Sequence, residues 1–324
     1  MTTRLSIALA TLLLITSCGG GNKQSSNTED STVGTTAKEV SYAPGTRRME
    51  RKISDIRLIT TREEYLDYID TYWDGFDFDA DSLVVAYDTL DMCQAMADYV
   101  TAIEPHRADS LLRQLMHRAE RSRPVLDYMS TIAEIVLHDP NSPLRNDEYY
   151  IPILEVLVES PLLDEYDRMI PAYDLQMARN NRLGHIANDF EYTLLNGRKG
   201  RMHKLDAEYL LIMLNNPGCP MCKEITMQIT SSPLLNELTE RGVLKVLAIY
   251  PDNDLEAWRN YQPEMPAAWI SGYDDGMRIS YDRTYDLKAI PALYLLDRDK
   301  RVLIKDGVDV GFVEHVISQC EATR

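Results

Sequence analysis

The chain has 324 residues, 44% of them hydrophobic, and its acidic side chains outnumber the basic ones to give a net charge of −17. A chain with this much negative charge repels the phosphate backbone of nucleic acids, and its sequence contains no basic stripe. The composition therefore argues against nucleic-acid binding. The length is sufficient for a signal segment and two domains of ordinary size.

The first residues predict export and lipid attachment. One basic residue precedes an apolar run over residues 5–15, which is too short to span a membrane and is typical of a secretory signal. The following Ile15-Thr16-Ser17-Cys18 resembles the lipobox of bacterial lipoproteins. The resemblance implies a signal peptide over residues 1–17 and acyl chains on Cys18, which anchor a protein stably when there are two or three. The alternative is an ordinary signal peptide that ends near a cysteine.

Residues 18–47 are predicted to be a flexible tether, because they are rich in Gly, Ser, Thr and Asn and hold almost no apolar residues. Their random-coil reach is about 30 Å, which holds a globular body clear of lipid headgroups. Glycines follow Cys18, where acidic residues mark surface-exported lipoproteins of Bacteroidetes. We therefore expect a lipid-anchored protein of the cell envelope that faces the periplasm, on the outer rather than the inner membrane.

Residues 48–181 show a helical pattern. Leu111, Leu112, Leu115 and Met116 recur at helical spacing, and alternation typical of strands is nearly absent. Prolines separate segments of helix length, several of them where the start of a helix tolerates proline. We expect an all-α domain of five to seven packed helices, with an aromatic group near the first turn formed by Tyr72, Trp73, Phe76 and Phe78.

From residue 183 to residue 324 the pattern changes to strands alternating with helices. Strands are expected over residues 190–195, 208–215, 243–250, 291–296 and 301–304. Helices are expected over residues 219–242 (bent near Pro233), 255–261 and 312–320. Strand–helix–strand units followed by a hairpin and a helix imply a mixed sheet with helices on both faces.

Asn216-Pro217-Gly218-Cys219-Pro220-Met221-Cys222 stands where an expected strand meets a helix. Unpaired backbone N–H groups and the helix dipole stabilise a thiolate at a helix start, and only a thiolate attacks another disulfide. The motif therefore predicts thiol–disulfide exchange, with Cys219 as the exposed nucleophile and Cys222 as the buried resolving thiol. A structural disulfide is one alternative, although it closes a very small loop. Half of a zinc site is another, although the remaining ligands are missing, and we expect no metal and no cofactor.

Two further motifs flank the cysteines. Gly184-His185-Ile186-Ala187-Asn188-Asp189-Phe190 precedes them, and Ile290-Pro291 follows late in the chain. In this order the three motifs resemble the thioredoxin fold, in its extracytoplasmic TlpA/ResA-like branch. The resemblance implies a cis peptide at Ile290-Pro291 facing the cysteines, with the Ile290 backbone free to pair with an extended substrate. It also implies protein thiols and disulfides as substrates, and a membrane or periplasmic redox partner.

The helical half is similar to a domain of unknown function found ahead of such thioredoxin-like domains in Bacteroidetes lipoproteins. Trp73-Asp74-Gly75-Phe76-Asp77-Phe78 carries the likeness, which implies no activity. One departure concerns Met213, which stands where thioredoxins carry a buried Asp that assists the resolving thiol. The branch often supplies a carboxylate from its central insertion instead, and this chain offers Asp252, Asp254, Glu256 and Glu264 there, none of which we assign.

The sequence thus predicts a membrane-tethered periplasmic thiol–disulfide oxidoreductase, acting as a reductase rather than an oxidase. The alternative is a non-catalytic lipoprotein binding module with a structural disulfide in a thioredoxin-like domain. Two further cysteines, Cys93 and Cys320, either bridge the two domains or remain free.

Overall fold

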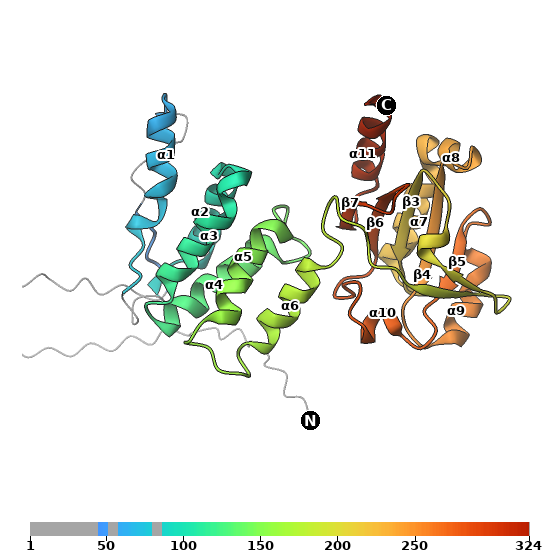
Figure 1. Ribbon diagram of the computed structural model, residues 1–324, viewed down its shortest axis with the longest axis horizontal. Helices are drawn as coiled ribbons and strands as arrows, with labels where there is room; N and C mark the ends of the chain where they lie inside the picture. The colour runs from blue at the N-terminus through green and yellow to red at the C-terminus, as the bar shows by residue number, and fades with distance from the viewer. Residues whose placement is uncertain (1–44, 51–57, 80–85, 324) are drawn as a thin grey trace, which may run out of the picture. The chain divides into compact units, whose positions relative to one another are not determined.

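The computed structural model describes residues 45–50, 58–79 and 86–323. The predicted signal peptide, Cys18 and most of the predicted tether lie outside these residues. Helices make up the first part of the described chain and a seven-stranded sheet with helices the second (Figure 1). The predicted fold class, an all-α part followed by a mixed α/β part, is confirmed. Among the described helices, none combines the length and the apolar character that crossing a membrane requires.

The helices of the first part begin where the sequence supplies caps or prolines. Thr61 and Glu64 form a capping box at the start of the first helix, and Pro105 opens the third. Six α-helices and one 3-10 helix are described here, within the range expected from the periodicity. Their bounds are α1 (Arg62–Asp70), η2 (Tyr72–Gly75), α2 (Thr89–Ala102), α3 (Pro105–Ala119), α4 (Arg123–Leu137), α5 (Asp147–Glu159) and α6 (Met169–Arg179).

The predicted aromatic group lies at η2, as expected. Tyr72, Trp73, Phe76 and Phe78 are each at most 5% exposed. The Phe76 and Phe78 ring centroids lie 4.8 Å apart in an edge-to-face arrangement. A Cβ atom on Gly75 would lie 1.7 Å from the carbonyl oxygen of Glu50, so only glycine fits in this turn. The aromatic motif is therefore part of the core of the helical part.

The second part is one sheet with strand order β2-β1-β5-β4-β3-β6-β7. The central pairs β3–β4 and β4–β5 are parallel, whereas β1–β2, β1–β5, β3–β6 and β6–β7 are antiparallel. The strands are β1 (Glu191–Leu194), β2 (Lys199–Arg201), β3 (Tyr209–Leu214), β4 (Leu244–Tyr250), β5 (Ile270–Tyr273), β6 (Ala292–Asp297) and β7 (Val302–Gly307). The helices are η4 (Met202–Lys204), α7 (Pro220–Ser231), α8 (Pro233–Glu240), α9 (Leu255–Tyr261), η5 (Gln262–Glu264), α10 (Arg278–Tyr281) and α11 (Val310–Ala322).

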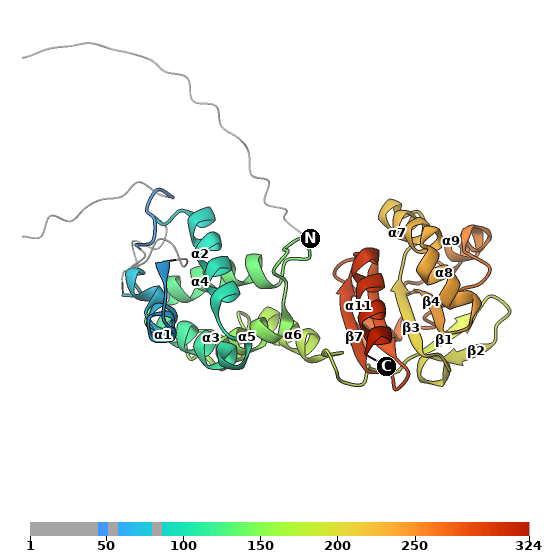
Figure 2. The same ribbon diagram turned by 90° about the horizontal axis from the view of Figure 1, so that it is seen from above.

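Side chains of β3 alternate between two apolar cores, one on each face of the sheet. Leu211 and Met213 face the core formed with α7, α8 and α11. Leu210 and Ile212 face the core that includes Met202 of η4 and Ile279 of α10. Figure 2 shows α7, α8 and α11 beside the strands. A strand buried on both faces holds its carboxyl end rigidly, and the cysteine motif follows directly after that end.

Candidate redox site

The two cysteines of the motif lie at the start of α7. Cys219 is the N-cap residue, and its Sγ accepts a hydrogen bond from the backbone N–H of Cys222 at 3.2 Å. Pro220 occupies the first helical turn, where a missing N–H costs nothing. Cys219 is half-buried, whereas Cys222 is 1% exposed. The structure thus gives the two sulfurs the unequal exposure that the sequence predicted.

The electrostatic environment separates the two thiols further. Burial raises the pKa of Cys222 to about 12, and the hydrogen bond that it makes with Cys219 acts in the same direction. Cys222 therefore remains protonated at neutral pH. Its backbone N–H and thiol both face the Cys219 sulfur, which is the accessible one of the pair. This arrangement favours attack by Cys219 and a resolving role for Cys222.

The Ile290-Pro291 peptide is cis and faces the cysteines, as predicted. The carbonyl oxygen of Ile290 lies 3.9 Å from Cys219 Sγ. The sheet register explains this proximity, because Leu214 at the end of β3 is paired with Ala292 at the start of β6. The structure thus brings together the predicted site residues Cys219, Cys222, Ile290 and Pro291, while the predicted lipidation site lies outside the described residues.

None of the four candidate carboxylates replaces the missing buried acid. Met213 is 1% exposed in the apolar core, and the four acids of the insertion are all exposed. Asp254 accepts a hydrogen bond from Ala257 N–H as the cap of α9. Glu264 pairs with Lys223 Nζ at 3.5 Å, one residue past the motif. The interior beneath Cys222 is therefore apolar.

Two aromatic residues of the insertion were not singled out from the sequence. Burial raises the pKa of Tyr261, with smaller contributions from Glu264, Cys222 and Cys219, which places its hydroxyl within electrostatic reach of the dithiol. Trp269 packs against the same apolar core as Cys219 and Ile290. No spacing signal identifies either residue, because their position depends on how the segment after β4 folds back over the start of α7.

All four cysteines in the described ranges, Cys93, Cys219, Cys222 and Cys320, are free thiols. Cys93 packs against the core of the helical part and Cys320 against a core of the sheet. Within the same ranges no group of three or more His, Cys, Asp or Glu side chains is arranged to hold a metal ion.

Comparison with known proteins finds relatives of both parts of the chain. A family model described as a domain of unknown function (DUF5106) matches residues 17–181, and one described as thioredoxin-like matches residues 206–302. The crystal structure of a thioredoxin-like protein from Bacteroides caccae is 34% identical, with a TM-score of 0.76 over 84% of this chain and 99% of the other. The C-terminal domain of an uncharacterized protein from Bacteroides fragilis is 43% identical, with a TM-score of 0.42 over 43% of this chain and 98% of that domain.

Curated relatives are more distant. Human nucleoredoxin is 24% identical over 113 residues, which are 35% of this chain. The chain spans about a quarter of the length of the nucleoredoxins that it matches. The likeness is therefore confined to part of each protein.

Proposed function

Since this chain belongs to the thioredoxin-like proteins that carry an N-terminal DUF5106 domain, we propose that it is a thiol–disulfide oxidoreductase acting through Cys219 and Cys222. One observation carries the proposal. The accessible Cys219 sulfur accepts the Cys222 N–H, while Cys222 is buried with its pKa raised to about 12. A nucleophile beside a protonated resolving thiol is what stepwise disulfide exchange requires.

In the proposed reaction, the Cys219 thiolate attacks one sulfur of a client disulfide. A mixed disulfide forms, and the other client sulfur leaves as a thiolate. Cys222 then loses its proton, attacks Cys219 Sγ and releases the second client sulfur. Two electrons have passed to the client, and Cys219 and Cys222 are joined in a disulfide. A membrane or periplasmic dithiol donor restores the dithiol by the reverse exchange.

We propose the reductive direction as part of this function. The state of Cys222 does not decide it, because a buried resolving thiol stays protonated in reducing and oxidising dithiols alike. We further propose that acyl chains on Cys18 tether the domain to a periplasm-facing membrane, with the outer membrane favoured. The lipobox supports this tether.

The experiment is alkylation of the reduced chain with iodoacetamide at mildly acidic pH, followed by exchange assays. Cys219 should be labelled well before Cys222, because only the thiolate reacts. Cys219→Ser should abolish reduction of a disulfide substrate, and Cys222→Ser should trap mixed disulfides through Cys219. Cys320→Ser removes another partly buried thiol and is the matched control, which should retain full activity.

Equal and slow labelling of both cysteines, together with unchanged exchange in Cys219→Ser, contradicts the proposal. That result would favour a binding module in which the cysteine pair is structural. A measured reduction potential decides the direction, since structural and reducing pairs lie far below the potentials of oxidases.

A further inference from the structure

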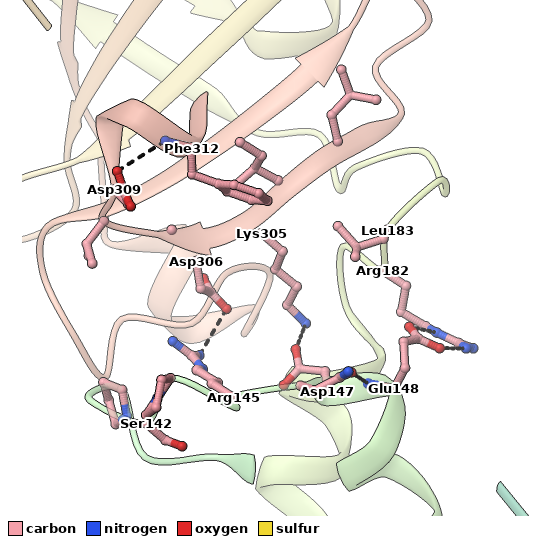
Figure 3. Close-up of a pocket in the computed structure, with 17 residues that line it drawn as sticks. Ser142, Arg145, Asp147, Glu148, Arg182, Leu183, Lys305, Asp306, Asp309 and Phe312 are labelled. Carbon is pink, nitrogen blue, oxygen red and sulfur yellow. Dashed lines mark hydrogen bonds and ion pairs between the residues drawn. The ribbon is translucent and has the colours of Figure 1, made fainter. Parts of the chain in front are cut away.

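The helical part of the chain forms one wall of a cavity on the thioredoxin-like part. The cavity has a volume of about 570 Å³ and lies between the α4–α5 segment and the β7–α11 segment (Figure 3). Strand β7 lies at one edge of the sheet, where Val302 already exchanges backbone hydrogen bonds with Gly184 and His185. The lining residues used below are Pro143, Arg145 and Asp147 on the helical side and Lys305, Asp306 and Phe312 on the other.

The loop that carries the cis peptide of the redox site lies close to this cavity. A smaller cavity beside it is lined by Pro140 and Arg145 of the helical part and by Ala289 and Pro291 of the loop before β6. Arg145 also lines the larger cavity, so the two are neighbours. Ile290, between Ala289 and Pro291, has its carbonyl oxygen 3.9 Å from Cys219 Sγ. The Ile290-Pro291 peptide therefore lies between Cys219 on one side and Pro140 and Arg145 of the helical wall on the other.

Ion pairs take up the charged groups of the cavity wall. Arg145 Nη2 lies 3.2 Å from Asp306 Oδ2, and Lys305 Nζ lies 2.5 Å from Asp147 Oδ2. A third pair joins Arg182 to Glu148 across the rim, with Nε to Oε1 at 2.8 Å. Figure 3 shows the first two pairs joining the helical segment to β7. Because opposite charges are matched in this way, the wall does not select a charged ligand.

The rim of the cavity is apolar and accessible. Leu183 is 54% exposed, Val308 is 50% exposed and Phe312 is 52% exposed. Pro140 and Pro143 are exposed on the helical side. Covering these apolar side chains lowers the free energy most when the bound chain is itself apolar and uncharged, because the charges of the wall are already paired.

We propose that the α4–α5 loop of the helical part and the β7–α11 segment form a groove that binds an uncharged, apolar segment of a client protein, close to the disulfide that Cys219 attacks. The assignment of the client rests on the proposed function. It gives the helical part a role in substrate selection, through Pro140 and Pro143.

Direct binding tests the groove without redox chemistry. The probe is a fluorescein-labelled, cysteine-free decapeptide of Val, Leu and Thr, whose affinity for the full chain is measured by fluorescence anisotropy. Phe312→Ser and Pro143→Asp should each weaken binding about tenfold, one from each wall. The matched controls are Leu195→Ser and Pro161→Asp, which change exposed residues outside the groove and should leave the affinity unchanged.

Turnover tests the link to Cys219. Two peptide disulfides are compared, one flanked by the same apolar segment and one by Ser and Glu, with a small aromatic disulfide as reference. Pro143→Asp should lower kcat/KM about tenfold for the apolar peptide, with the other two substrates unchanged. Circular dichroism confirms that each variant is folded.

The outcomes separate the two proposals. If the cysteine-free peptide binds and neither Phe312→Ser nor Pro143→Asp weakens its binding, the groove proposal is wrong, even when the redox assays succeed. If both wall variants weaken peptide binding but no disulfide is reduced, the groove proposal stands and the proposed redox function is wrong. If the chain binds no peptide but self-associates, and Phe312→Ser abolishes that self-association, the groove binds a second copy of the chain and the client role is wrong.

Discussion

Asp306 provides the sharpest test of the electrostatics on the edge strand. Its side chain is 7% exposed, accepts a hydrogen bond from the Tyr294 hydroxyl and faces Arg145 at 3.2 Å. Burial outweighs the attraction of Arg145 and Lys305 and raises the pKa of Asp306 to about 6. Asp306→Asn keeps an oxygen acceptor for Tyr294 but cannot titrate. We therefore predict that wild type and variant differ in how their stability depends on pH.

The size of the effect follows from linkage. An unfolded Asp titrates near pH 3.9, so the pKa is raised by roughly two units on folding, which corresponds to about 3 kcal/mol. Because the folded chain binds this proton more tightly, the stabilisation is fully present below about pH 4 and is lost as the pH rises through about 6. About 2 kcal/mol of the change falls between pH 4.5 and 7.5.

Urea unfolding followed by circular dichroism across this pH range is the assay. Subtracting the variant curve from the wild-type curve removes other titrating groups, such as Glu148, whose lowered pKa acts in the opposite direction. The exposed Asp299→Asn is the control and should leave the wild-type slope unchanged. Parallel curves for wild type and Asp306→Asn would refute the reasoning, because they would mean that Asp306 has the same pKa in both states.

Three further predictions concern other parts of the chain. Lys305→Met should lower the free energy of unfolding by about 3 kcal/mol, because Nζ donates hydrogen bonds to three carbonyl groups at the end of α6 and pairs with Asp147. The exposed Lys199→Met is the control and should change the free energy of unfolding by less than about 0.5 kcal/mol. Equal losses in the two variants would contradict this account. Phe76→Ala should cost about 3–5 kcal/mol in urea unfolding, against almost nothing for the exposed Leu195→Ala, and a loss below about 1 kcal/mol would contradict its place in the core. Cys18→Ala should move the protein from the detergent phase to the aqueous phase, and unchanged partitioning would contradict the proposed anchor.

The sequence predicts most elements here because their signals are local. The helical period of α3 and α4 and the apolar runs of β3 and β4 each lie within about fifteen residues. Strand β5 was missed, because four residues that include Gly272 carry no alternation. A Cβ atom on Gly272 would lie 2.9 Å from the ring of Tyr192, so this strand depends on its neighbour β1. Its existence is a tertiary property.

The same reasoning applies to the site. The cysteines and Ile290-Pro291 were predicted because their motifs are short and their order resembles a known family. Tyr261 and Trp269 were missed, since their approach to the dithiol depends on the fold of the insertion. The pair Arg145–Asp306 joins residues 161 positions apart, and no pattern in either segment indicates the partner. Contacts between the helical part and the sheet therefore required the structure.

The apolar interior below Cys222 has a consequence for the resolving step. Met213 replaces a buried acid and the insertion carboxylates are exposed, so in the described part of the chain neither position offers a buried carboxylate to take the Cys222 proton. The client thiolate released by the first attack has an ordinary pKa near 8.5, far below that of Cys222, and it is formed beside the dithiol. Proton transfer to it is uphill by several pKa units, so it succeeds only while the thiolate stays close. A groove that holds the client segment against Pro140 and Phe312 prolongs that contact, and it links the helical part to the chemistry of Cys219.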